Sequence, residues 1–252
     1  MSLDRWLKRM VVVVMLSGLF LVNPSLTIAA DGSQIGSFTG NVGWFSEYRF
    51  RGLDQSGDAT ALQGGLDWAH DSGFYFGTWG SNVDFNDNNS TLEADIYGGY
   101  ATEFSGVSVD LSMIGYVYPG SDSTSDYDFL EYAIGLGYGL GPASFSFGFN
   151  HSGQFYAGSG EANYYSGGVD YEAPLGVVLS AHVGRQTVEF GEAYGANDYM
   201  DWSFGASYAW QGFDLSVTYI DTDIGASQND PGDDGAPTSK NGTAVLGISR
   251  SF

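Results

Sequence analysis

The sequence contains no cysteine, only six prolines, and only eight lysines and arginines among its 252 residues. The absence of cysteine excludes a disulfide framework, thiol catalysis and thiolate metal sites. Thirty acidic residues set the formal net charge at −22, which argues against nucleic acid as a partner, because lysine and arginine are the main contacts to phosphates. No hydrophobic run after residue 30 is long enough for a membrane-spanning helix, so the protein is either soluble or crosses a membrane in another way.

The first thirty residues have the pattern of a secretory signal peptide. Arg5, Lys8 and Arg9 precede an apolar run over residues 10–22, and small residues follow up to Ala30. This order of basic, apolar and small residues predicts a signal peptide over residues 1–30. An uncleaved anchor is the alternative, but the apolar run is shorter than the roughly 20 residues that cross a bilayer as a helix. Cleavage would leave five basic and twenty-nine acidic residues.

From residue 41 to the C-terminus, apolar and polar residues alternate with the period of two that is typical of β-strands. The 38 glycines, 17 tyrosines and 17 phenylalanines are consistent with a β-rich fold. The alternation predicts about twelve strands of roughly ten to thirteen residues, the length that a tilted strand needs to cross a membrane. Short connections alternate with longer polar ones, which cover residues 52–58, 86–90, 119–125, 152–160, 189–197 and 223–241.

One face of each predicted strand is apolar and often aromatic, whereas the other carries glycine, serine, asparagine and acidic residues. In the predicted strand over residues 74–85, the apolar face holds Tyr75, Trp79, Val83 and Phe85, and the polar face holds Thr78, Asn82 and Asp84. A soluble β-protein is the alternative, but its solvent-facing side would be rich in lysine and glutamate. An even strand number, alternating short and long connections and a signal peptide are typical of outer-membrane barrels of Gram-negative bacteria. The predicted fold is all-β, a transmembrane antiparallel up-and-down β-barrel of about twelve strands over residues 41–252, after a short periplasmic segment over residues 31–40.

Aromatic residues of the apolar faces collect toward the strand ends, where the two membrane interfaces favour them. We expect contacts with outer-membrane lipid and lipopolysaccharide there, with Trp44 near the short-turn end. The final strand ends in Phe252, which resembles the C-terminal signal that the barrel-assembly machinery recognises in outer-membrane proteins. The predicted interface residues are Trp44, Trp68, Tyr100, Tyr138, Tyr171, Trp202, Phe213 and Phe252.

Four segments of the first half of the predicted barrel also carry a family resemblance. The sequences SEYRFRG, ALQGGLD, GFYFGTWGSNV and EADIYGGY, which begin at residues 46, 61, 73 and 93, resemble the TorF family of proteobacterial porin-like proteins, a family of conserved hypothetical outer-membrane proteins. The resemblance covers most of the mature chain and is most specific over residues 41–118. It implies a porin-like outer-membrane barrel and supplies no substrate.

The polar faces of the strands predict an acidic lumen. Rings of acidic side chains favour cations and repel anions, so we predict a channel for passive diffusion of small polar solutes with a preference for cations. A barrel of this size can also be filled, and the alternative is a structural or adhesive barrel with a closed lumen that acts through its long extracellular loops. The predicted pore-lining residues are Glu47, Arg49, Arg51, Asp67, Asp84, Glu93, Asp95, Asp110, Glu131, Asp170, His182, Asp201 and Asp214.

The segment over residues 41–52 holds two of the few basic residues. Its alternation predicts a single strand in which Tyr48 and Phe50 face lipid. Arg49 and Arg51 are then expected on the lumen wall, where neighbouring carboxylates can pair with them. No segment is left over for a plug, which favours an open lumen.

We predict neither catalysis nor a cofactor. Twelve-stranded outer-membrane phospholipases use a histidine and a serine, but His70, His151 and His182 stand alone, without a nucleophile motif. The loop that begins at Asp84 partly matches a calcium-binding loop but has Asn89 in place of the required glycine, so no metal is expected.

Overall fold

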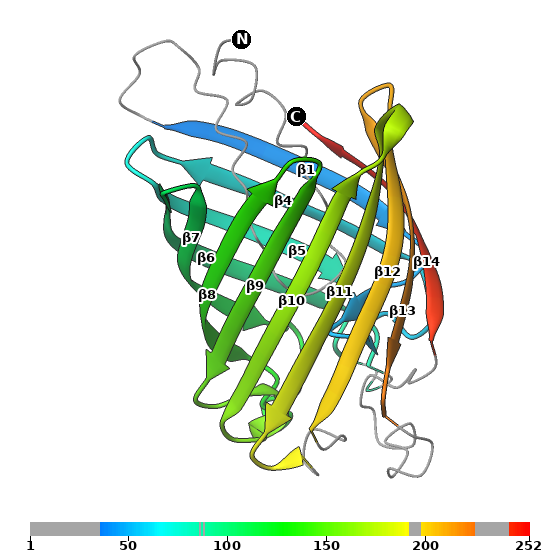
Figure 1. The fold of residues 1–252 in the computed structure, drawn as a ribbon. Coiled ribbons are helices and arrows are strands. Elements are labelled where there is room, and N and C mark those ends of the chain that lie inside the picture. Colours follow the sequence, from blue (N-terminus) through cyan, green and yellow to red (C-terminus); the bar gives the residue numbers. More distant parts are fainter. Residues whose placement is uncertain (1–35, 86, 88, 192–197, 225–241) are drawn as a thin grey trace.

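The computed structural model describes residues 36–85, 87, 89–191, 198–224 and 242–252, and the predicted signal peptide over residues 1–30 lies outside them. In this part of the chain, twelve antiparallel strands close into a barrel (Figure 1). The first strand pairs with the last, so the barrel has no open edge with unpaired backbone groups. The barrel strands are β1 (Ser37–Phe45), β4 (Ala61–Ala69), β5 (Phe74–Asn82), β6 (Leu92–Phe104), β7 (Val107–Val117), β8 (Phe129–Leu140), β9 (Ala143–Ser152), β10 (Ala162–Glu172), β11 (Val177–Val188), β12 (Tyr199–Trp210), β13 (Phe213–Thr222) and β14 (Thr243–Ser251).

The predicted fold class and strand number are confirmed. The barrel begins at Ser37, which is earlier than the predicted start at residue 41 and lies within the predicted periplasmic segment. No helix among the described residues is long and apolar enough to span a membrane.

Short turns gather at one end of the barrel and longer connections at the other (Figure 1). Ser105 and Gly106, which join β6 to β7, have φ values of 53° and 82°, as a two-residue hairpin turn with the twist of its strands requires. The described chain also starts and ends at this end: Ser37 pairs with Ala69 beside the first short turn, and Phe252 exchanges backbone hydrogen bonds with Gly40.

The outer face of the barrel is apolar. Along β8, exposed side chains alternate with inward ones, as predicted, and the exposed ones are Leu130, Tyr132, Ile134, Leu136 and Tyr138. Such a face is favourable in contact with hydrocarbon and unfavourable in contact with water.

The predicted orientation of β5 is wrong. Tyr75 and Trp79 were expected on the lipid-facing side but are 6% and 5% exposed and belong to the interior cluster, whereas Phe74 and Phe76 are exposed on the outside. Aromatic residues occupy both faces of this strand, so hydrophobicity alone does not set its orientation. The hydroxyl of Tyr75 donates to Asp110 on β7, a contact that is made only with Tyr75 inside.

The predicted first strand is also wrong beyond Phe45. Instead of continuing along the wall, the chain turns into the barrel and forms a small antiparallel hairpin of β2 (Arg49–Phe50) and β3 (Leu53–Asp54), so Phe50 is buried inside rather than facing lipid. A strand from Ser37 to residue 51 would be longer than β6, the longest strand of the barrel with 13 residues, and longer than a tilted strand needs to cross the hydrocarbon layer. We call residues 46–58 the inner hairpin.

Candidate functional site

The inner hairpin crosses the interior of the barrel. Near its start, the hydroxyl of Tyr48 donates to Glu93 on β6 at 2.8 Å, and its ring packs edge-on against Trp79 on β5. Phe50 packs edge-on against Tyr116 on β7. Residues of three adjacent wall strands therefore hold the first half of the inner hairpin.

The tip of the inner hairpin reaches the opposite wall. Arg51 donates one hydrogen bond to Glu131 on β8 at 2.7 Å and another to Gln186 on β11 at 2.8 Å. Its guanidinium carbon lies 4.2 Å from the ring centre of Tyr164 on β10, a cation–π contact. Gly52 lies so close to Thr222 on β13 that a methyl group in place of its hydrogen would approach to 2.4 Å. The hairpin therefore touches the wall on both sides of the lumen.

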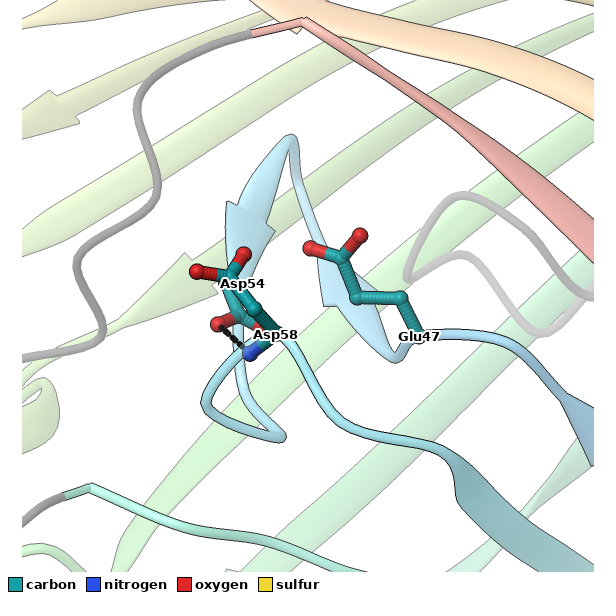
Figure 2. A group of neighbouring side chains, drawn as sticks. All are labelled: Glu47, Asp54 and Asp58. Carbon is teal, nitrogen blue, oxygen red and sulfur yellow. Dashed lines mark hydrogen bonds between the residues drawn. The ribbon is translucent and has the colours of Figure 1, made fainter.

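The base of the inner hairpin carries three acids, Glu47, Asp54 and Asp58, which Figure 2 shows as neighbours. One carboxylate oxygen of each lies within 4.8 Å of those of the other two. Arg49 lies among them, in an ion pair with Glu47 and 3.9 Å from Asp58. Asp54 accepts hydrogen bonds from the backbone N–H groups of Ser56 and Asp58 at 2.9 and 2.7 Å. These contacts explain the cluster as the internal support of the hairpin.

A group of buried acids surrounds the hairpin on the wall. Glu93, Asp95 and Glu131 are each 1% exposed. Glu131 accepts hydrogen bonds from Asn150 and Arg51, but both carboxylate oxygens of Asp95 are buried without a donor among the described residues. Of these three carboxylates, Glu131 is paired with the Arg51 guanidinium, so the group as a whole keeps an excess of negative charge.

A second polar group lies on β10, β11 and β12. The hydroxyl of Tyr164 lies 2.9 Å from His182 Nε2 and donates to Asp201 at 2.9 Å, and His182 Nε2 is 3.2 Å from Asp201. Gly184 leaves room for this contact, because a methyl group there would come within 2.0 Å of the Tyr164 hydroxyl. This group fixes the ring on which Arg51 rests.

The half of the barrel nearer the short turns is less densely filled. Asp67 is half-buried and accepts a hydrogen bond from Tyr97, and Asp110 accepts from Tyr75. Asp170 and Asp214 also remain partly exposed on inward-facing positions. Side chains near the inner hairpin are buried almost completely, so the lumen narrows toward the long-loop end.

Aromatic side chains of the long connections extend this filling. Phe85, Tyr118 and Tyr127 pack against Tyr156, with Tyr127 and Tyr156 stacked at 4.6 Å. They lie beside β5, β7, β8 and β9 at the long-loop end. The inner hairpin joins this layer through the backbone N–H of Asp84, which donates to Gln55 at 2.8 Å.

The predicted pore-lining residues fall into three sets. Most point inward from the wall: Asp67, Glu93, Asp95, Asp110, Glu131, Asp170, His182, Asp201 and Asp214. Glu47, Arg49 and Arg51 lie inside but belong to the inner hairpin, which corrects their predicted place on the wall. Asp84 was predicted on the inner face of a strand, but it is exposed and follows β5, because that strand ends at Asn82 and has the opposite orientation.

Sequence reasoning did not single out Tyr48, Phe50, Tyr164 and Gln186 as interior contacts. The turn-forming pairs Arg51-Gly52 and Ser56-Gly57 were available signals for a hairpin, since glycine at positive φ favours tight turns. Gln186 is a polar residue at an inward position of β11 and follows the alternation of that strand.

The predicted interface aromatics lie on the outward-facing positions of their strands or at the C-terminus. Trp44 is near the end of β1 at Phe45 and so approaches the long-loop end of that strand, not the short-turn end. The exposed members are Trp44, Tyr100, Tyr138, Tyr171, Trp202 and Phe252, and Trp68 and Phe213 are half-buried. Their place at a membrane interface stays a prediction.

Solved porins share this architecture. The KdgM porin matches with a TM-score of 0.55 and 10% identity over 85% of this chain and 99% of that chain. The NanC porin matches with a TM-score of 0.53 and 12% identity over 86% and 99%. Another KdgM structure, described as a complex with disordered oligogalacturonate, matches with a TM-score of 0.53 and 10% identity over 85% and 98%. At such identities the similarity concerns the fold alone.

In sequence, residues 29–252 match the model of a family described as a bacterial protein of unknown function, Gcw_chp. No curated protein matches the chain. The name TorF and the proteobacterial range of the resembled family stay predictions.

Proposed function

The chain belongs to the Gcw_chp family of bacterial proteins, and we propose that it forms an outer-membrane channel for passive diffusion of small polar solutes, with a preference for cations. The main support is the closed porin-like barrel with an apolar outer face and an inner wall that carries many carboxylates. The predicted signal peptide and C-terminal Phe252 support export and insertion by the barrel-assembly machinery, with lipid and lipopolysaccharide around the outer face.

The preference for cations rests on the inner charges. Nine predicted lumen residues point inward from the wall strands, and eight of them are acids: Asp67, Glu93, Asp95, Asp110, Glu131, Asp170, Asp201 and Asp214. Among the described residues, the arginines inside the barrel are Arg49 and Arg51 of the inner hairpin. An excess of carboxylates attracts cations and raises the barrier for anions.

The same charges argue against acidic sugars as solutes. Oligogalacturonate, the ligand in one KdgM complex, is a polyanion. Carboxylates such as Asp110 and Asp214 on the wall of this barrel would repel it. We therefore propose that the similarity to KdgM does not extend to its ligand.

The inner hairpin is proposed as the constriction of this channel. Its side chains and the aromatic residues of the long connections fill the outer half, whereas Asp67, Asp170 and Asp214 of the other half keep partial exposure. Few backbone hydrogen bonds join it to the rest of the chain, among them those of Ser46 with Leu246 and of Asp84 with Gln55, so we propose that it can move while the barrel stays closed. The described arrangement then corresponds to a narrow state.

Dense filling also favours a second candidate function. A barrel whose interior is closed by the inner hairpin would act as a structural or adhesive protein through its long loops. The complete burial of Arg51, which is 0% exposed between Glu131 and Tyr164, supports this candidate. The two candidates differ in whether the barrel ever conducts ions.

We propose no catalytic role. His70 lies 2.7 Å from the hydroxyl of Ser72, but the pair belongs to one exposed turn, and no carboxylate orients the histidine among the described contacts. The described partners of His182 are Tyr164 and Asp201, so no serine nucleophile contacts this histidine among them.

Planar-bilayer recording of the purified protein tests the channel. We expect discrete conductance steps. In a potassium chloride gradient, the reversal potential should shift toward the equilibrium potential of potassium. Migration on gels before and after boiling would first establish that the barrel is folded. A folded protein without any conductance, also after Arg51→Ala, would support the structural candidate, and an anion-selective reversal potential would refute the electrostatic argument.

A further inference from the structure

The wall residues around Arg51 have the chemistry of a guanidinium-binding site. A carboxylate from Glu131, an amide oxygen from Gln186 and the ring face of Tyr164 surround the group, with hydrogen bonds of 2.7 and 2.8 Å and a ring distance of 4.2 Å. A planar cation is recognised by such a combination of hydrogen-bond acceptors and an aromatic face.

These wall residues are held in place independently of the inner hairpin. Glu131 also accepts hydrogen bonds from Asn150 at 3.1 Å and from Tyr116 at 3.3 Å. The amide nitrogen of Gln186 donates to the backbone oxygens of residues 163 and 187, which leaves its oxygen facing the lumen. The site would therefore keep its geometry after Arg51 had left it.

The carboxylates around this site outnumber its positive groups, which favours binding of a further cation. Asp95 is 1% exposed, and neither of its carboxylate oxygens has a hydrogen-bond donor among the described residues. Glu93 and Glu131 are close enough to Asp95 to repel its charge, and Arg51 is paired with only one of the three carboxylates, that of Glu131. Buried carboxylates without a counter-charge are unfavourable, so this region attracts positive groups.

Arg51 itself stands at a strained position. Its φ of 48° belongs to the left-handed region, which is unfavourable for a residue with a long side chain. The contacts with the wall compensate this strain, and a competing ligand that took over those contacts would release it.

We propose that Glu131, Gln186 and Tyr164 form a binding site for the guanidinium or ammonium group of a passing solute, and that Arg51 occupies the site as a tethered competitor. Solutes such as basic amino acids or polyamines then displace Arg51 and move the inner hairpin aside. The inference rests on the proposed channel function and names its solute class.

Uptake of labelled L-arginine and L-citrulline into proteoliposomes tests the inference, because the two differ little in shape but citrulline is uncharged at its side-chain end. We expect wild-type uptake of arginine to be roughly tenfold faster, which is the factor that a single hydrogen bond to a charged group provides. Guanidinium chloride should compete with arginine uptake and leave citrulline uptake unchanged.

Glu131→Gln should remove most of the preference, and the matched control Glu161→Gln, which changes an exposed acid, should keep it. If Glu131→Gln does not fold by the gel-migration criterion, Gln186→Leu removes the second acceptor without altering charge. Equal uptake of arginine and citrulline by a conducting wild-type channel would overturn the inference and leave the channel intact. A barrel that neither conducts ions nor takes up either solute would refute the channel and the inference together.

Discussion

Arg51 and Glu131 form an ion pair of 2.7 Å inside the barrel, and their side chains are at most 2% exposed. One residue belongs to the tip of the inner hairpin and the other to β8, so the pair ties the hairpin to the wall. Burial of both charges makes the pair costly to break from one side, because the remaining charge is left without a partner.

A double-mutant cycle on this pair tests the tie. Glu131→Ala alone should destabilise the barrel by about 3–5 kcal/mol, and Arg51→Ala together with Glu131→Ala should cost clearly less than the sum of the single changes. Urea unfolding in lipid vesicles, followed by tryptophan fluorescence, measures the free energies. Additive losses would show that the two charges do not depend on each other.

Removal of the Arg51 side chain should open the constriction. Arg51→Ala deletes both hydrogen bonds to the wall and leaves the acids of that wall unopposed, so ion conductance and cation preference should both increase. Arg185→Ala is the matched control, because it removes the same charge from an arginine that is exposed on β11. Single-channel recording with reversal potentials measures both quantities, and identical behaviour of the two variants would argue against a special role of Arg51.

A disulfide can hold the inner hairpin in its described position. A Cβ atom at residue 57 would lie 3.4 Å from that of Asp84, close to the roughly 3.5–4.5 Å found in disulfides. Since the chain has no cysteine of its own, Gly57→Cys with Asp84→Cys creates a single pair. We expect oxidation to suppress conductance and a reductant to restore it, with each single cysteine variant as control. Conductance that persists in the oxidised double variant would show that this part of the hairpin need not move.

Gly184 and Gly139 provide a matched test of the wall beside Arg51. A methyl group at residue 184 would meet the Tyr164 hydroxyl at 2.0 Å, whereas one at residue 139 would meet no atom within 4 Å. Gly184→Ala should therefore destabilise the barrel by about 1–3 kcal/mol through overpacking, and Gly139→Ala should stay within about 0.5 kcal/mol of the wild type. Equal unfolding free energies of the two variants would contradict the packing around Tyr164.

Much of the barrel follows from periodicity alone. Strands such as β8 have one apolar and one polar face, so alternation determines both the strand and its orientation. In β5 this argument fails, because Phe74, Tyr75 and Phe76 place aromatic rings on both faces. The hydrogen bond from the Tyr75 hydroxyl to Asp110, a residue distant in sequence, explains which face of β5 points inward.

The inner hairpin escaped prediction for a related reason. Arg49 and Phe50 do form a short strand, but a period of two does not state which sheet a strand joins. Arg51 pairs with Glu131 and Gln186, and a single sequence gives no sign of such long-range pairs. The acids of the wall were predictable as inward residues, whereas the inner hairpin that they surround was not.

Shortening of the inner hairpin tests the central claim most directly. Phe45 and Ala61 are directly paired in the β1–β4 register, so a two-residue Asn-Gly turn can replace residues 46–60 and join the strands as an ordinary hairpin. Single-channel recording compares this variant with the wild type after gel migration has established folding. If the barrel is a cation-preferring channel constricted by the hairpin, the shortened protein shows a severalfold larger conductance and retains its cation preference; an unchanged conductance, or none, would contradict the account.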